Sequence, residues 1–410
     1  MGQNMSRSLY PVISIEEAWQ RIVSVVRPLP PVALPITEVL GHVLAEDIVA
    51  VENMPPFRAS AMDGYAVLAE DTSAERRVVG EQDAGRQKPL RIEPGTAVRI
   101  MTGAPLPEGA DAVIRVEDAV EGDGRLRFSA PASPGDNVRP IGQDITVGDT
   151  VLEKGLILGP AEIGLLAMIG HTKVLVHPKP KVAVMATGDE LVPPDRTLAP
   201  GEIRDSNSYA VAAAVEAAGG RSVRLGLIPD NEAALRAAIL EGVSRADMLL
   251  STGGVSMGVR DLIKPLLEKL GTVYFGQVAV RPGKPLTFAT IKGVPVFGLP
   301  GFPVSSLVSF ELFARPALRI MAGQRKLWRP EVPARLNHPI RHSPDRTEFQ
   351  RAIVALRDGE YWAETTGVQV SGRLKSLVGA NALLKLPAGV SEFKQGGAIA
   401  AILINQAEVS

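Results

Sequence analysis

Short apolar runs alternate with segments of helical periodicity between residues 181 and 321. The runs have the length of buried strands, and the segments after them carry apolar residues at intervals of three and four. The predicted order is strand 181–186, helix 209–218, strand 222–227, helix 231–240, strand 248–250, helix 262–270, a pair of strands within 285–297 and helix 304–321. Such alternation predicts an α/β domain with a mainly parallel sheet that is covered by helices on both faces.

The chain before residue 181 has a different pattern. Ser14 and Glu17 form a capping box, which predicts a helix that ends by Pro28. The other elements predicted here are a second amphipathic helix over 36–40, a strand over 43–51, a helix over 160–169 and a strand over 173–177. Between residues 55 and 140 the pattern is instead one of short strands broken by glycine and proline, which indicates an inserted β domain.

These changes of pattern divide the chain into four domains. The last begins after Gly323, where strands with glycine and proline turns continue to Leu403. The predicted domains are a discontinuous α+β N-terminal domain (1–50 and 141–178), an inserted β domain (51–140), an α/β domain (179–327) and a small C-terminal β domain (328–410). The predicted fold class is a multidomain α/β plus β protein with a central three-layer α/β/α domain.

Composition and charge narrow the possible functions. The 410 residues are 45% hydrophobic and 22% charged, as is typical of a globular protein. With 44 basic and 45 acidic residues there is no overall field to attract nucleic acid or an anionic membrane, so recognition of an anion must be local. The lack of cysteine excludes disulfides and thiolate catalysis. No apolar run has the length of a transmembrane helix and no signal-peptide pattern opens the chain, so we expect a cytoplasmic protein without nucleic-acid or membrane partners.

Three loops between residues 251 and 306 carry residues suited to an anion. They contain Gly253 and Gly254, then Arg281, Lys284 and Pro285, then Ser305 and Ser306. Glycines let backbone N–H groups approach an oxyanion, the two cations sit on a loop stiffened by proline, and the serines begin a predicted helix whose free N–H groups favour an anion. Each loop alone could be an ordinary turn, but three at successive predicted strand ends indicate a site for a phosphorylated ligand.

Carboxylates near these loops suggest a divalent metal. Asp261 opens the predicted helix 262–270 and is a hard oxygen ligand suited to Mg²⁺. Asp189 and Glu190 follow the first strand of the α/β sheet, where they could hold a metal, act on a proton or form a capping turn. Two alternatives, helix capping and contact with the ligand, stay open for Ser206, Asn207 and Asp230.

Seven segments together resemble the molybdopterin molybdenumtransferase family, which includes the C-terminal domain of gephyrin. They are SAMDGYA (60–66), RIMTGAPLPEGADAV (99–113), ATGDEL (186–191), DSNSY (205–209), TGGVSMGVRD (252–261), RPGKP (281–285) and GLPG-PVSS (298–306, less one position). They occur in the family's order and extend over nearly the whole chain, which makes the resemblance specific.

The resemblance implies a four-domain homodimer that performs the last step of molybdenum cofactor assembly. It also implies that residues 1–50 and 141–178 form the dimerisation domain and residues 179–327 the molybdopterin-binding domain. Adenylylated molybdopterin is cleaved, molybdate is inserted at its dithiolene, and AMP is released with the help of Mg²⁺. The implied partners are adenylylated molybdopterin, molybdate, a second copy of the chain and the upstream adenylyltransferase. The residues agree with this implication, because an adenylate needs phosphate-binding glycines and molybdate needs cations.

The family's functional residues can be carried over by position. The catalytic set is Asp189, Glu190, Asp261, Arg281 and Lys284, of which Glu190 and Asp261 would hold the metal. The substrate-binding set is Asp63, Thr102, Asp144, Ser206, Asn207, Asp230, Gly253, Gly254, Ser256, Pro285, Ser305, Ser306, Arg346 and Ser371. The resemblance implies that Asp63, Thr102 and Asp144 reach the cleft of the partner subunit.

The chain departs from the family pattern at three places. Arg58 and Ala59 stand where the family usually has Asp-Asn, which reverses the local charge. Phe302 replaces an asparagine and so removes an amide donor and acceptor. Arg281 takes a place often held by lysine, which keeps the charge but changes its geometry.

Two alternative functions follow from these observations. A stand-alone molybdopterin adenylyltransferase resembles residues 179–327, but the additional domains and the RPGKP loop argue against it. A non-catalytic paralogue that binds molybdopterin or acts as a scaffold, as gephyrin does for receptors, is supported by the departures at Arg58, Ala59 and Phe302.

Overall fold

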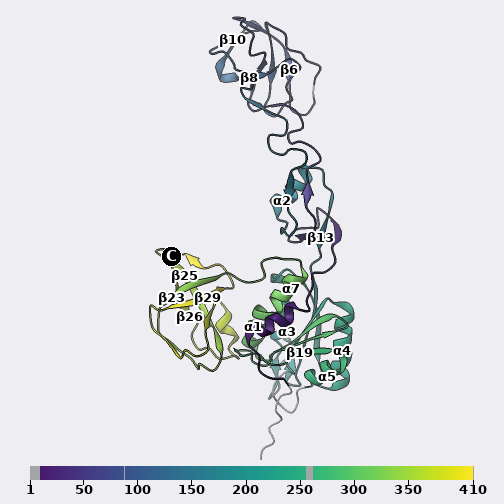
Figure 1. Ribbon diagram of the computed structural model, residues 1–410, viewed down its shortest axis with the longest axis vertical. Helices are drawn as coiled ribbons and strands as arrows, with labels where there is room; N and C mark the ends of the chain where they lie inside the picture. The colour runs from purple at the N-terminus through teal and green to yellow at the C-terminus, as the bar shows by residue number, and fades with distance from the viewer. Residues whose placement is uncertain (1–9, 87, 255–261, 410) are drawn as a thin grey trace, which may run out of the picture. The chain divides into compact units, whose positions relative to one another are not determined.

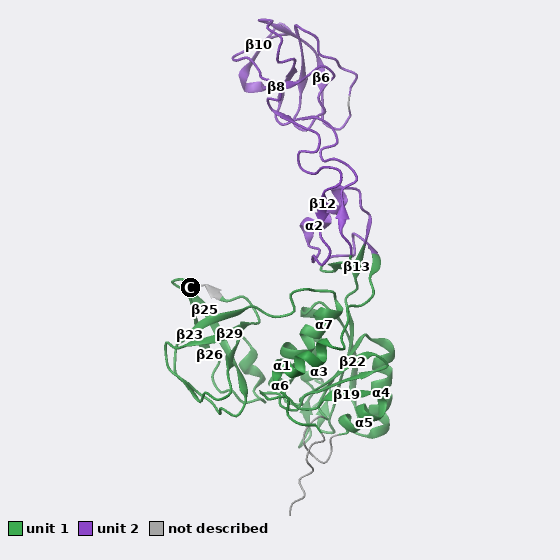
Figure 2. Cartoon of the chain, viewed as in Figure 1, with its two compact units in different colours: residues 1–33, 41–45, 175–410 green, residues 34–40, 46–174 purple. Residues whose placement is uncertain are grey.

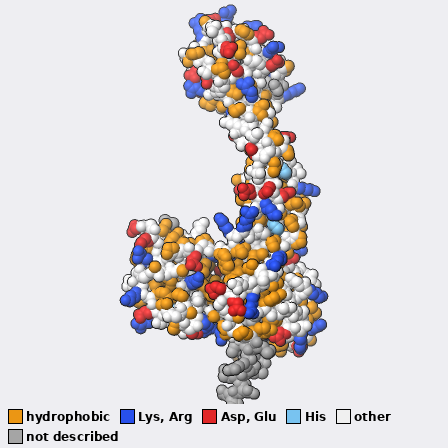
Figure 3. Space-filling model, viewed as in Figure 1, with side chains coloured by type: hydrophobic (Ala, Val, Ile, Leu, Met, Phe, Trp, Pro, Cys, Tyr) orange, Lys and Arg blue, Asp and Glu red, His pale blue; other side chains and the backbone are white. Residues whose placement is uncertain are grey.

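The computed structural model describes residues 10–86, 88–254 and 262–409. The chain forms two compact units, one of residues 1–33, 41–45 and 175–410 and one of residues 34–40 and 46–174 (Figure 2). The larger unit is thus built from both ends of the sequence, and it contains an α/β domain and a C-terminal β barrel. Basic and acidic side chains are interspersed on the visible face of each unit, in agreement with the near-zero net charge (Figure 3).

A six-stranded sheet forms the centre of the α/β domain (Figure 1). Its order is β17 (Arg221–Ile228), β14 (Lys181–Thr187), β18 (Met248–Thr252), β22 (Val294–Leu299), β21 (Thr287–Ile291) and β19 (Thr272–Phe275). The first four strands are parallel, and β21 and β19 are antiparallel additions. The parallel strands end at one edge of the sheet, so the loops after β14, β17, β18 and β22 lie along that edge.

Alternating side chains of the strands bury two hydrophobic layers. Val182 and Val184 of β14 belong to one core and Ala183 and Met185 to the other, as the period of two in a strand requires. The first core also takes residues from α1 (Ile15–Val23), α3 (Asn207–Ala217), α6 (Pro303–Ser309), a π-helical segment (Phe310–Ala314) and α7 (Arg315–Met321). The second takes residues from α4 (Glu232–Arg245) and α5 (Ile263–Leu270). The predicted three-layer α/β/α domain with a mainly parallel sheet is therefore confirmed.

A closed ring of five strands forms the C-terminal barrel. The order is β25 (Thr347–Arg357), β26 (Glu360–Thr365), β23 (Glu331–Leu336), β29 (Ala398–Leu403) and β27 (Ala382–Leu386), which pairs again with β25. Two short strands extend it from β25, namely β20 (Val280–Arg281) and β30 (Glu408–Val409). The other elements are a ribbon of β24 (Ile340–Arg341) and β28 (Glu392–Phe393), and a 3-10 turn, η3 (Leu374–Leu377). β20 lies within the α/β part of the sequence but pairs with a strand of the barrel. This pairing holds the loop of residues 282–285 next to the barrel.

The smaller unit is mainly β structure, as predicted for the insertion. Its six-stranded sheet has the order β8 (Ala112–Arg115), β5 (Gly64–Val67), β7 (Thr96–Ile100), β6 (Arg76–Gln82), β10 (Arg125–Phe128) and β9 (Ala119–Gly122), with η1 (Val116–Asp118) before β9. Its other elements are β4 (Ala59–Ser60), β11 (Val138–Arg139), β3 (Ile48–Val49), β12 (Thr150–Leu152) and α2 (Pro160–Met168). Buried residues lie on both faces of the large sheet. The division of the chain into four domains stays a prediction.

Short paired strands complete the structure, and one of them corrects a predicted helix. The strands β1 (Val32–Pro35), β13 (Lys173–His177) and β2 (Val43–Leu44) pair in that order, and β15 (Leu191–Val192) pairs with β16 (Ile203–Arg204). The helix predicted over 36–40 is wrong, since these residues form a turn after β1 in which the Glu38 N–H donates to the Pro35 carbonyl. Five residues are too few to nucleate a helix beside a chain that already pairs as a strand.

Candidate functional site

A cavity of about 710 Å³ lies where the α/β domain meets the C-terminal barrel within the larger unit. It is lined by Glu190, Ile203, residues 280–285, residues 300–303, Ser305, Arg346 and residues 369–371. Three cations line it, Arg281, Lys284 and Arg346, and we call it the cationic cavity. Five separate segments of the sequence thus place predicted site residues on one surface, including Pro285, Ser305 and Ser371.

The loop that carries Lys284 is held by backbone contacts. The Val278 N–H donates to the Lys284 carbonyl at 3.0 Å, and β20 pairs with β25 immediately before the loop. Gly283 has φ +111°, and a Cβ at this position would lie 2.5 Å from Oγ of Ser309. Both features favour glycine at this position, so the backbone turn immediately before Lys284 depends on Gly283.

Gly283→Ala is expected to destabilise the loop by about 1–3 kcal/mol, because it combines a strained φ with a steric contact. The lysine that follows would move, so weaker binding of an oxyanion should accompany the lower melting temperature. Thermal unfolding and calorimetry measure the two effects. Gly293→Ala is the control, since Gly293 also has positive φ (+82°) but no atom lies within 4 Å of its Cβ position. Equal losses in both variants, with no change in binding, would contradict this account.

One carboxylate joins two of the three cations. Asp345 Oδ1 lies 3.1 Å from Nη2 of Arg281, and its Oδ2 accepts from Nε of Arg346 at 2.8 Å. Ser343 also donates its hydroxyl to Oδ1 at 2.6 Å. The Ser343 hydrogen bond and, next, that of Arg346 lower the pKa of Asp345 to about 2. Lys284 has no carboxylate partner among the residues that the structure describes, so its charge is not compensated in this way.

Ser343→Ala is expected to raise the pKa of Asp345 toward its ordinary value, since the serine supplies the largest lowering contribution. A carboxyl with a depressed pKa stabilises the folded state fully above its unfolded pKa of about 3.9 and loses that contribution as the pH falls toward 2. The variant should therefore lose this contribution at a higher pH. NMR titration of the Asp345 carboxyl carbon measures the change, and an unaltered midpoint would contradict it.

The loop that carries Ser371 is organised around a buried arginine. Arg351 of β25 is fully buried, and its guanidinium donates to Oγ of Ser376 at 3.0 Å and to the carbonyls of Gln369 and Val370 at 3.5 and 3.4 Å. The Ser371 carbonyl in turn accepts from the N–H of Val304 at 3.1 Å. These contacts tie the cavity wall of the barrel to the start of α6.

Other predicted site residues lie at the carboxyl ends of the parallel strands. The Gly253 N–H donates to the Leu299 carbonyl at 3.2 Å, and a Cβ on Gly253 would lie 2.3 Å from the Thr187 carbonyl oxygen, so glycine permits this close approach. Asn207 Nδ2 donates to the Gly301 carbonyl at 2.6 Å. Asp230 accepts from the Thr187 hydroxyl at 3.4 Å.

The remaining predicted residues of the larger unit differ in burial and in side-chain hydrogen bonding. Ser306 is fully buried, and its hydroxyl has no hydrogen-bond partner among the described residues. Ser206 is exposed and makes no side-chain cap at α3; the capping contact comes from Asp205, which accepts from the Ser208 N–H at 3.0 Å. Gly254 follows Gly253 with φ +64°, and Ser256 lies outside the described residues.

The three predicted residues of the smaller unit form contacts of their own. Asp63 accepts from both the N–H and the hydroxyl of Thr102 at 2.7 Å, and these bonds lower the pKa of its carboxyl. Asp144 pairs with Arg139 at 2.7 Å. Asp63 and Thr102 are therefore a preformed polar pair on the surface of that unit.

The residues suited to a metal are only partly described. Glu190 lines the cationic cavity, Asp189 is exposed, and Asp261 lies outside the described residues. In the described ranges, no group of three His, Cys, Asp or Glu side chains could hold a metal ion. Among the described residues, Glu190 supplies the one carboxylate that lines the cationic cavity.

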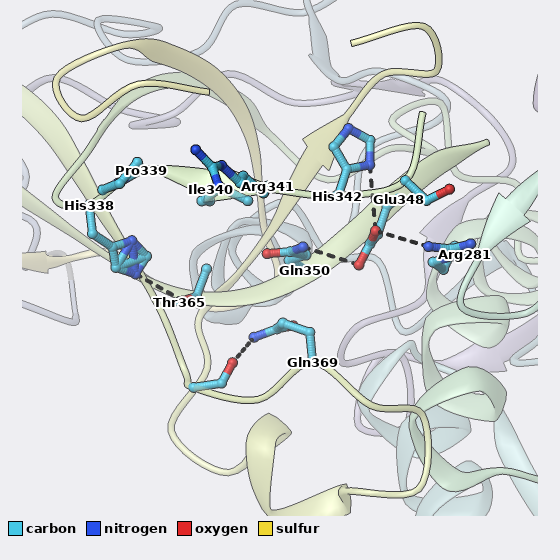
Figure 4. Close-up of a pocket in the computed structure, with 12 residues that line it drawn as sticks. Arg281, His338, Pro339, Ile340, Arg341, His342, Glu348, Gln350, Thr365 and Gln369 are labelled. Carbon is cyan, nitrogen blue, oxygen red and sulfur yellow. Dashed lines mark hydrogen bonds and ion pairs between the residues drawn. The ribbon is translucent and has the colours of Figure 1, made fainter. Parts of the chain in front are cut away.

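A second cavity, of about 430 Å³, adjoins the first and was not predicted from the sequence (Figure 4). Arg281 and Gln369 line both. In the second cavity the buried carboxylate of Glu348 lies among Gln350, His342 and Arg281, at 3.1, 3.5 and 3.8 Å from their side-chain nitrogens (Figure 4). Neither Glu348 nor Asp345 belongs to a motif, and each meets Arg281 across more than sixty residues of sequence, so no local signal could have found them.

The departures from the family pattern have clear positions. Phe302 lines the cationic cavity with 62% of its surface exposed, so an aromatic ring stands at the rim where the family has an amide. Arg58 lies in the smaller unit and its guanidinium is 3.4 Å from the carbonyls of Ala110 and Asp111.

No helix in the described ranges is long and apolar enough to cross a membrane.

Comparison with known proteins agrees with this architecture. Three family profiles match consecutive parts of the chain: the MoeA N-terminal region (domains I and II) at residues 13–170, a probable molybdopterin-binding domain at 183–320, and the MoeA C-terminal region (domain IV) at 333–404. A crystal structure of a molybdopterin biosynthesis MoeA protein from Pyrococcus horikoshii has a TM-score of 0.84 and 34% identity, and it covers 97% of this chain and 100% of that one.

Curated proteins from three organisms are similar in sequence to this chain over most of its length. Molybdopterin molybdenumtransferase 2 of Mycobacterium tuberculosis is 37% identical over 396 residues, which are 93% of this chain and 97% of the relative. Molybdopterin molybdenumtransferase of Haemophilus influenzae is 38% identical over 86% of this chain and 89% of its own length. Gephyrin of Dictyostelium discoideum is 38% identical over 90% of this chain and 59% of its own length. The resemblance inferred from the seven segments is confirmed, and the chain belongs to the MoeA family of molybdopterin molybdenumtransferases.

Proposed function

We propose that this protein inserts molybdate into adenylylated molybdopterin and releases AMP. The observation that carries the proposal is the cationic cavity, in which Arg281, Lys284 and Arg346 face one space together with the hydroxyl-bearing residues Ser305 and Ser371. Molybdate is a tetrahedral dianion, and three cations with hydroxyl donors match its charge and its oxygen acceptors. The curated relatives named for this activity support the proposal.

The residues at the cavity would contact different parts of the two substrates. Arg281 and Arg346 would bind oxygens of the oxyanion with planar guanidinium groups, and Lys284 would add a compact charge. The carboxyl ends of the parallel strands, with Gly253 and Asn207, are suited to the adenylate part of the substrate. Binding both reactants at neighbouring positions would lower the entropic cost of bringing them together.

The proposal includes the properties that the family resemblance implies. Mg²⁺, held in part by Glu190 and Asp261, would neutralise the pyrophosphate. The active form would be a homodimer in the cytoplasm, in which Asp63, Thr102 and Asp144 reach the cleft of the second copy. The adenylylated substrate would come from the upstream adenylyltransferase.

The test is AMP release from adenylylated molybdopterin by the purified protein. Release that requires both molybdate and Mg²⁺ is expected. Tight binding of the adenylate without AMP release would overturn the proposal in favour of a non-catalytic binding protein. Reversion of Phe302 to asparagine would then show whether the exposed aromatic ring at the cavity rim is the cause.

A further inference from the structure

We propose that Asp345 is a positioning residue that holds the guanidinium groups of Arg281 and Arg346 in the wall of the cationic cavity and thereby sets its affinity for an oxyanion. The inference rests on the proposed function of that cavity. It assigns a role to a carboxylate that belongs to none of the seven family segments.

Asp345 reaches both guanidinium groups at once. Its Oδ1 lies 3.1 Å from Nη2 of Arg281 and its Oδ2 lies 2.8 Å from Nε of Arg346, while the Ser343 hydroxyl fixes the carboxylate from a third direction. A carboxylate with both oxygens engaged by different arginines fixes the distance between those arginines. Two cations at a fixed separation can match two oxygens of a tetrahedral anion without first losing rotamer freedom.

Arg281 is held from a second side as well. Its Nη1 lies 3.8 Å from Oε2 of Glu348, and Arg281 and Glu348 are opposite each other in the pairing of β20 with β25. Figure 4 shows Glu348 approaching Arg281 from the side of the second cavity. One Nη therefore meets each carboxylate, an arrangement that arginine allows and that the single ammonium of lysine does not reproduce. This accounts for arginine at a position often held by lysine.

A purely electrostatic role gives the opposite expectation. Asp345 is absent from the lining of the cationic cavity, and a negative charge close to an anion site weakens anion binding. If Asp345 acted only through its charge, removing that charge would tighten the binding of molybdate. If it acts by holding the arginines, the same substitution weakens binding. The sign of the change separates the two roles.

The experiment compares Asp345→Asn with the unaltered full-length protein, using molybdate alone as the probe in calorimetry. Asparagine keeps the size of the side chain and removes its charge, and we expect affinity about tenfold lower. The control is Glu360→Gln, which disrupts an ion pair with Arg335 at 2.8 Å on the same barrel and at matched exposure (51% against 49% for Asp345) but touches no cavity residue. Its affinity should not change.

A double-variant cycle tests whether Asp345 acts through Arg281. Asp345→Asn should cost less affinity in an Arg281→Lys background than in the unaltered protein, because lysine lacks the two-point contact. Full additivity of the two losses, or tighter binding by Asp345→Asn, would overturn the proposal. The KM for molybdate should rise in Asp345→Asn while that for adenylylated molybdopterin stays the same.

The crystal structure of Asp345→Asn without ligand gives an answer that is independent of molybdate. The guanidinium groups of Arg281 and Arg346 should leave the positions they have here, and unchanged positions would overturn the proposal. If the unaltered protein fails to bind molybdate, the proposed function fails, whereas the crystal structure still decides whether Asp345 holds the arginines.

Discussion

Lys284→Ala is expected to lower kcat/KM for molybdate-dependent AMP release by about 10²- to 10³-fold, the loss typical of removing one preorganised charge or donor from an anion-stabilising site. Lys284 is half-buried in the cationic cavity, and among the described residues its ammonium has no carboxylate partner. Arg281 and Arg346, in contrast, share Asp345. The uncompensated cation supplies more of the attraction for a dianion than either arginine, so its loss should have the larger effect.

Two companion variants make this result specific. Lys326→Ala removes the same charge from an exposed position that lines no cavity described here, and its activity should stay within about twofold of the unaltered protein. Lys284→Arg keeps the charge on a larger head group and should recover part of the lost activity. A Lys284→Ala variant with activity within threefold of the unaltered protein would show that the arginines alone bind the anion.

Periodicity predicted the α/β layers because the strands of that sheet are buried on both faces. Val182 to Met185 are a continuous apolar run, and the buried residues of α4 (Leu235, Ala238, Ile239 and Val243) recur at intervals of three and four. The seven segments predicted site residues on particular loops, and three of these residues, Arg281, Lys284 and Ser305, line one cavity. The chemical roles of these residues stay predictions. So does the role of Asp261, which lies outside the described residues.

Long-range pairing was beyond what the sequence could indicate. The loop of residues 281–285 is predicted to lie at a strand end of the α/β sheet, but the strand before it, β20, has two residues and pairs with β25 of the barrel instead. A strand of that length has no periodicity, so its partner depends on where the rest of the chain places it. The ion pair between Arg281 and Asp345 follows from that pairing, which explains why it has no sequence signal.

The buried Arg351 shows how the barrel supports the site, and Arg351→Met is expected to destabilise the loop of residues 366–376 by about 3 kcal/mol. The substitution leaves the carbonyls of Gln369 and Val370 without their buried donor. Hydrogen exchange at the amide of Thr366, which donates to the Arg351 carbonyl, should become about 100-fold faster. Molybdate affinity should fall too, because Ser371 lies on this loop.

Two opposing effects decide the outcome of that substitution. Burial lowers the pKa of Arg351 to about 10, in agreement with a free-energy cost of holding the charge beneath the loop of residues 366–376, and methionine removes that cost. Against this stand three hydrogen bonds of the guanidinium and the nearby negative charge of Glu348, all of which methionine loses. Removing one partner of a buried network costs more than the desolvation that it relieves, unless the other partners are removed with it. Arg351→Lys, which keeps the charge but loses the fork geometry, should therefore fall between the two proteins. Unchanged or slower exchange in the methionine variant would contradict this account, because the relief of desolvation would then equal or exceed the loss of the hydrogen bonds.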